Sequence, residues 1–107
     1  MNFKEYQELA ERTAGQISED KRFANFAMGV AGEAGEVCDY LKKVLFHGHE
    51  FDKEILTKEL GDVMWYIATL ANTANIDLEE IAKKNIEKLK KRYPEGFSEE
   101  DSINRVE

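Results

Sequence analysis

Apolar residues recur along the chain at intervals of three and four positions, the spacing that puts them on one face of an α-helix. The pattern predicts four helices, which begin after Asn2, Ser18, Asp52 and Asp77. Pro94 ends the last of them, because proline clashes with a continuing helix. No stretch alternates as a strand would. We therefore expect an all-α fold, an antiparallel bundle of about four helices completed by oligomerisation.

Polar residues at the predicted helix starts support these boundaries. Asn2 is followed three positions later by Glu5, and Asp77 by Glu80, the spacing of a capping box. We therefore expect Asp77 to cap the fourth helix with its own side chain.

Length and charge restrict the classes of function. The 107 residues suffice for one domain, which we place at 1–97, followed by an acidic and loose tail at 98–107. The formal charge of −7 argues against nucleic-acid binding and against a polybasic membrane anchor. Cys38 is the only cysteine, so no internal disulfide can form, and a cytoplasmic location is expected.

Two pairs of acids interrupt the apolar faces of the second and third helices. Glu33 and Glu36 form one pair, and Glu59 and Asp62 the other. Residues three apart share a helix face, so each pair projects together. Carboxylates beside an apolar face are costly unless they are protonated or bind a cation, and an all-oxygen set favours Mg²⁺ or Mn²⁺. Spacing alone leaves the alternative of solvated surface acids open.

Glycines in the second helix and cations in the fourth helix are weaker indications of a ligand-binding site. Gly29, Gly32 and Gly35 recur every third residue, which fits either close helix packing or room for a ligand beside the acids. In the fourth helix Asn85, Lys88 and Arg92 share one face and could bind phosphate oxygens. On spacing alone a solvated basic face is the more common explanation.

Together these motifs resemble the MazG-like all-α nucleoside triphosphate pyrophosphohydrolases. The resemblance spans about residues 23–97 and rests on four segments: Gly32-Glu33-Ala34-Gly35-Glu36-Val37, Glu59-Leu60-Gly61-Asp62-Val63, Asn85 with Lys88, and Arg92-Tyr93-Pro94-Glu95-Gly96-Phe97. It implies that Mg²⁺, with Mn²⁺ as a substitute, is held by Glu33, Glu36, Glu59 and Asp62. It also implies nucleotide contacts from Tyr66, Asn85, Lys88 and Arg92, and assembly into homodimers or homotetramers. Some members carry an extra Glu where this chain has Gly32.

The resemblance implies hydrolysis of a nucleoside triphosphate or deoxynucleoside triphosphate at the α–β linkage, in nucleotide-pool housekeeping. Glu33 or Glu36 would act as the catalytic base. Two alternatives remain: a phosphoribosyl-ATP pyrophosphohydrolase, and a helical interaction module without activity. The preferred base and sugar are not predicted by the sequence.

Overall fold

The computed structural model describes residues 1–106, which form α-helices and no strand. The helices are α1 (Phe3–Glu11), α2 (Glu19–Phe46), α3 (Lys53–Thr73), α4 (Leu78–Arg92) and α5 (Glu99–Ile103). The predicted all-α fold is confirmed for this part of the chain. None of these helices is long and apolar enough to cross a membrane.

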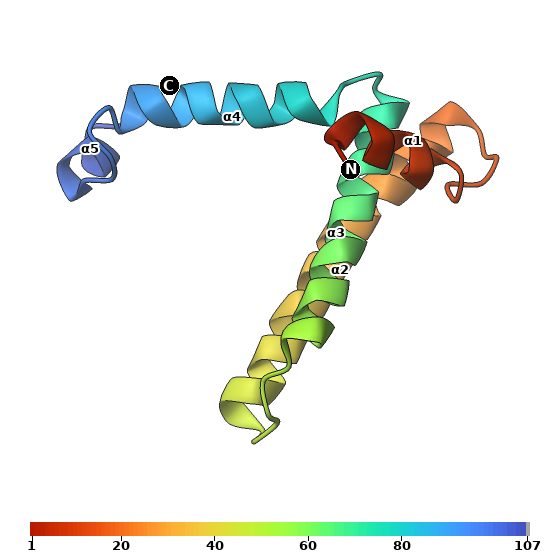
Figure 1. Cartoon of the computed structure of the whole chain (residues 1–107), viewed down its shortest axis with the longest axis horizontal. Helices are drawn as coiled ribbons and strands as arrows, with labels where there is room; N and C mark the ends of the chain where they lie inside the picture. Colours follow the sequence, from red (N-terminus) through yellow and green to blue (C-terminus); the bar gives the residue numbers. More distant parts are fainter. Residues whose placement is uncertain (107) are drawn as a thin grey trace.

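The long helices α2 and α3 lie side by side as an antiparallel hairpin (Figure 1). A Tyr40 hydroxyl from α2 secures the connection between them. It accepts a hydrogen bond from the Asp52 N–H at 2.7 Å and donates one to the Asp52 carbonyl at 3.2 Å. The loop that precedes α3 is thus held against the end of α2.

The small apolar core lies where α1, α3 and α4 meet. Ala10, Ala68, Ala71 and Leu78 form its buried cluster, and Trp65 packs against it. Alanines dominate this cluster, so the helices approach closely but bury little apolar area. The hairpin therefore leaves much of its length outside the core.

Asn2 and Asp52, which stand at two of the predicted helix starts, cap α1 and α3 with their side chains. The Glu5 N–H donates to Asn2 Oδ1 at 2.8 Å, and the Glu54 N–H donates to Asp52 Oδ1 at 2.9 Å. The prediction for Asp77 is wrong, because it occupies the N-cap position of α4 but its side chain makes no capping hydrogen bond. The first N–H of α4, that of Leu78, donates to the side chain of Gln7 in α1.

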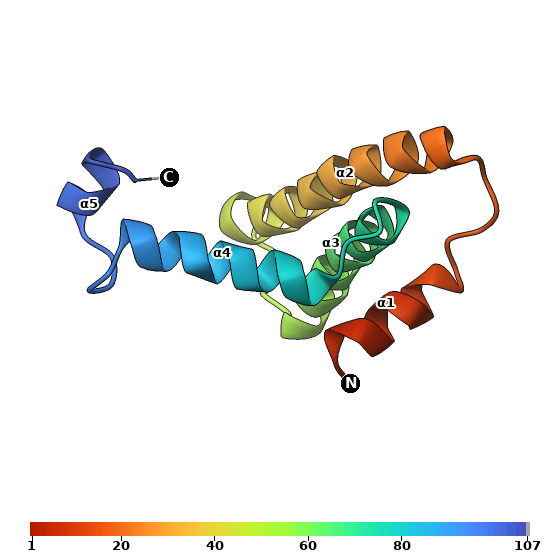
Figure 2. The same cartoon turned by 90° about the horizontal axis from the view of Figure 1, so that it is seen from above.

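Helix α4 leaves the end of the hairpin and points away from it, instead of returning alongside α2 and α3 (Figures 1 and 2). The radius of gyration is consequently 16.9 Å, against about 13 Å for a compact domain of this length. The accessible surface is 8178 Å², against about 6100 Å² for a compact monomer of 12.3 kDa. A single copy thus exposes about 2000 Å² more than a compact fold would.

The acidic tail contains a helix that its composition does not predict. Ser98 caps α5 by accepting a hydrogen bond from the Asp101 N–H at 3.0 Å. Tyr93 and Phe97 stack just before it, with ring centroids 5.2 Å apart. Glu107, the last residue of the expected tail, lies outside the described residues.

Candidate metal centre

Carboxylates from α2 and α3 meet across the hairpin. Glu33, Glu59 and Asp62 each place one carboxylate oxygen within 4.8 Å of the other two. Glu33 and Glu59 are half-buried, whereas Asp62 is exposed. Because α2 and α3 pack along their length, Glu33 and the pair of Glu59 and Asp62 converge although they are far apart in the sequence.

Glu36 is the predicted ligand that stands outside this group of three. It is exposed and lies one turn further along α2 than Glu33. Its negative charge is nevertheless one of the causes that raise the pKa of Glu33. Three of the four predicted metal ligands are therefore brought together, and the fourth lies at the edge of the site.

The pKa of Glu33 is raised above its ordinary value of 4.5. Partial burial is the main cause, and the negative charges of Asp62, Glu59 and Glu36 add to it. Like charges at this separation favour protonation or a cation. The donor set is all oxygen, which suits a hard divalent ion such as Mg²⁺ or Mn²⁺.

Tyr66 lies one turn after Asp62, in an aromatic cluster between the two helices. Its ring is 6.3 Å from that of Phe26 and 5.0 Å from that of Trp65. It also lies directly over Gly29, where a Cβ would overlap the ring. Tyr66 thus packs against the backbone of α2 within a turn of the carboxylates, and Gly29 is what allows it.

The other glycines of the motifs have a different environment. A Cβ on Gly32, Gly35 or Gly61 would meet no atom within 4 Å. The sequence left packing and ligand space as alternatives for this series. The structure separates them: Gly29 serves packing, whereas the glycines beside the acids border open space.

The predicted phosphate-binding residues lie on α4, away from the carboxylates of the same chain (Figure 1). Asn85 and Lys88 line one groove together with Ile76 and Ile81. Arg92, at the end of the helix, donates from Nε to the carbonyl of Val106 at 3.3 Å. The structure therefore does not bring Asn85, Lys88 and Arg92 together with Glu33, Glu59 and Asp62 within one copy.

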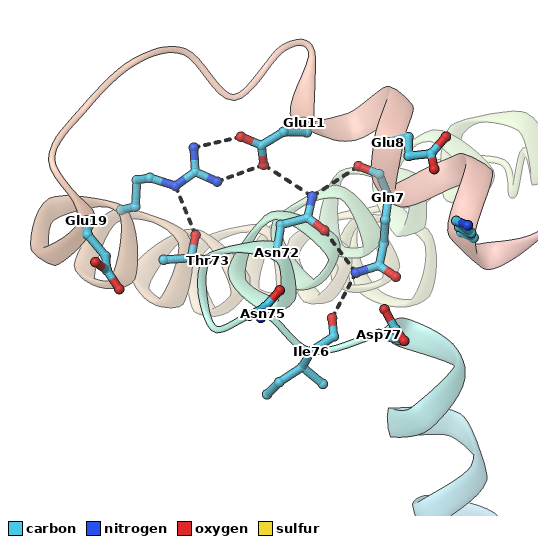
Figure 3. Close-up of a pocket in the computed structure, with 11 residues that line it drawn as sticks. Gln7, Glu8, Glu11, Glu19, Asn72, Thr73, Asn75, Ile76 and Asp77 are labelled. Atoms are coloured by element: carbon cyan, nitrogen blue, oxygen red, sulfur yellow. Dashed lines mark hydrogen bonds and ion pairs between the residues drawn. The ribbon is translucent and has the colours of Figure 1, made fainter.

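A second hollow is lined mainly by polar residues of α1, the start of α2, the end of α3 and the turn before α4 (Figure 3). Its side chains are already engaged with one another. Arg22 forms a bidentate ion pair with Glu11 at 2.7 and 2.8 Å, and its Nε donates to Thr73 at 3.1 Å. Asn72 donates to Glu11 at 3.2 Å. These groups tie helices together and form no metal centre.

Sequence reasoning missed this junction, and in particular Gln7. Gln7 is buried, and its side chain hydrogen-bonds to Asn72, Ile76 and Leu78. A signal was present, because Gln7 stands four residues after Phe3 and three before Ala10, on the apolar face of the first helix. A polar residue on such a face needs a partner, but the sequence does not say which.

Comparison with known proteins gives two matches. Residues 22–97 match the family described as the MazG nucleotide pyrophosphohydrolase domain. The chain is also similar to the Gene 37 protein of Mycobacterium phage L5, with 34% identity over 96 residues that cover 86% of this chain and 84% of the phage protein. No solved structure matches.

Proposed function

Because the chain belongs to the MazG nucleotide pyrophosphohydrolase family, we propose that it hydrolyses nucleoside or deoxynucleoside triphosphates at the α–β linkage. The products are a nucleoside monophosphate and pyrophosphate, which suits a role in nucleotide-pool housekeeping. The observation that carries the proposal is the convergence of Glu33, Glu59 and Asp62 inside the segment that matches the family. Such a cluster suits a metal-assisted attack on a polyphosphate.

In this proposal Glu33, Glu59 and Asp62 hold Mg²⁺, and Glu36 completes the set from the edge. Bound Mg²⁺ would screen the triphosphate and stabilise the charge that develops on its oxygens. Mn²⁺ would substitute, since it accepts the same oxygen ligands.

Glu33 or Glu36 serves as the catalytic base. A water attacks the α-phosphorus, and its proton passes to the carboxylate while the bond from this phosphorus to the bridging oxygen breaks. Pyrophosphate leaves with the electron pair of that bond.

Asn85, Lys88 and Arg92 bind the phosphates in this proposal, and Tyr66 borders the nucleotide. Since α4 points away from the carboxylates of its own chain, we propose a homodimer or homotetramer in which α4 of one copy approaches the hairpin of another. The large exposed surface of the single chain supports such an assembly.

A substrate panel tests the reaction. Purified protein is incubated with each common nucleoside triphosphate and deoxynucleoside triphosphate, and with phosphoribosyl-ATP, in Mg²⁺, Mn²⁺ or a chelator. We expect metal-dependent release of pyrophosphate and nucleoside monophosphate. Orthophosphate as the first product would reject α–β cleavage, and turnover of phosphoribosyl-ATP alone would reassign the substrate. Turnover of none would favour a non-enzymatic helical module.

A further inference from the structure

The first amide of α4 depends on a side chain from a distant part of the sequence. The Leu78 N–H donates to Gln7 Oε1 at 2.8 Å, a buried hydrogen bond between residues 71 positions apart. Asp77 precedes this amide but does not cap the helix with its side chain. The first N–H groups of a helix have no acceptor within that helix, so the Leu78 N–H of α4 uses an acceptor from α1.

The Gln7 side chain is held so that only one orientation satisfies its partners. Its Nε2 donates to Asn72 Oδ1 at 2.9 Å and to the Ile76 carbonyl at 3.0 Å. Asn72 in turn donates to the Gln7 carbonyl at 3.0 Å (Figure 3). These bonds direct Oε1 toward α4 and fasten the turn between α3 and α4 to α1.

The position of this junction matters because α4 is long and exposed beyond it. Leu78 is buried with Ala10 in the core, whereas Ile81 and Ile86 are exposed. Lys88 lies ten residues, or about 15 Å, beyond Leu78 at 1.5 Å per residue. A tilt of about 20° at the start of α4 would therefore move Lys88 by about 5 Å. Such a shift exceeds the reach of a hydrogen bond.

We propose that Gln7 is a positioning residue, which sets the direction of α4 and so the place of Asn85 and Lys88. The functional part of this inference rests on the proposed function, in which these two residues bind the phosphates of the substrate. Gln7 itself touches neither substrate nor metal.

Two substitutions of similar size test the hydrogen bond. Gln7→Met removes the acceptor for the Leu78 N–H, whereas Gln7→Glu keeps an acceptor but loses both Nε2 hydrogen bonds, so that a carboxylate oxygen faces Asn72 Oδ1 and the Ile76 carbonyl. We expect amide exchange at Leu78 to quicken on the order of tenfold in Gln7→Met, and by less in Gln7→Glu, which keeps an acceptor. Glu8→Ala, an exposed neighbour on α1, is the control and should leave this exchange unchanged. Unchanged exchange in Gln7→Met would overturn the cap.

The direction of α4 is measured without reference to activity. Spin labels on the exposed Cys38 of α2 and on Lys91→Cys at the end of α4 report their separation, in protein diluted with unlabelled chain. Gln7→Met and Gln7→Glu should both broaden or shift the distance distribution, because each removes the Nε2 hydrogen bonds to Asn72 and Ile76. An unchanged distribution in Gln7→Met would show that Gln7 does not set the direction.

Kinetics test the consequence for substrate. Gln7→Met should raise KM for the nucleotide several-fold, with the apparent Mg²⁺ affinity unchanged. A fall in kcat with unchanged KM would contradict the positioning role. If the wild-type chain hydrolyses no nucleotide, the proposed function fails, while amide exchange and label distances still decide the role of Gln7.

Discussion

Single glycines show what a residue pattern can and cannot predict. Gly29 and Gly32 are equivalent in the sequence, three residues apart on one helix and both costly relative to alanine. Only the structure reveals that Tyr66 lies over the first and that nothing lies over the second. The difference depends on a residue 37 positions away, which no local pattern encodes.

This difference predicts opposite effects for two alanine substitutions. Gly29→Ala should destabilise the protein by about 1–3 kcal/mol, because the new methyl group displaces the Tyr66 ring. Gly32→Ala should stabilise it by up to about 1 kcal/mol, since alanine favours a helix and meets no neighbour. Urea unfolding of both variants beside the wild type provides the measurement. Equal effects in the two variants would contradict the assigned packing.

Substitutions of Asp62 and Glu36 should differ in their effects on Mg²⁺ binding and on catalysis. Asp62 belongs to the converging group, whereas Glu36 stands at its edge. Even outer groups around a metal typically contribute about 10–100-fold in affinity, so Asp62→Asn should weaken Mg²⁺ binding by at least that much. Glu36→Gln should weaken it less, yet still remove most pyrophosphate release if Glu36 is the base. Calorimetric Mg²⁺ titration beside a pyrophosphate assay separates the two effects, and equal losses of affinity would show that Glu36 contributes as much to Mg²⁺ binding as Asp62.

At the scale of elements, periodicity predicted the four main helices and their order, because each carries its own apolar face and end signals. It also placed the acid pairs on facing helices, since a short loop joins α2 to α3. The direction of α4 could not be predicted in this way. It depends on Gln7, a residue of α1 whose partners lie more than 60 positions along the chain.

The ion pair between α1 and α2 predicts how stability changes with acid. Arg22 donates two hydrogen bonds to Glu11 and so lowers the pKa of this carboxyl below its ordinary 4.5. A lowered folded-state pKa contributes stability above pH 4.5, which is lost as the pH falls through the folded value. Glu11→Gln should therefore lower stability by about 0.5–1 kcal/mol near neutral pH, as expected for an exposed pair. It should also flatten the fall in stability below pH 4.5.

Thermal unfolding between pH 7 and pH 3 measures this dependence. Glu8→Gln is the matched control, because it removes the same charge from the same helix without disturbing Arg22. If both variants follow the wild-type acid profile, the pair with Arg22 contributes nothing to stability.

At the scale of the whole molecule, a single copy leaves its proposed site in two parts. The carboxylates lie on the hairpin and the phosphate-binding residues on a separate arm. The sequence predicted both groups by type, because their chemistry depends on residue identity and local spacing. Their arrangement in space depends on the direction of α4 and on contacts between copies, which local spacing does not determine.

Assembly of copies predicts a concentration-dependent active form. Ile86 is half exposed on α4, where an apolar side chain gains little unless a partner covers it. Ile86→Glu should shift the protein toward a monomer in sedimentation at micromolar concentration, because a charge would be buried at the contact. Pyrophosphate release should fall as the assembly dissociates, because α4 of one copy then no longer approaches the hairpin of another copy. Lys91→Glu puts the same side chain at an exposed position on a different face of the same helix and should keep the assembly. A wild-type chain that sediments as a monomer and still turns over nucleotide would refute the shared site, and α4 would then have to swing to its own hairpin.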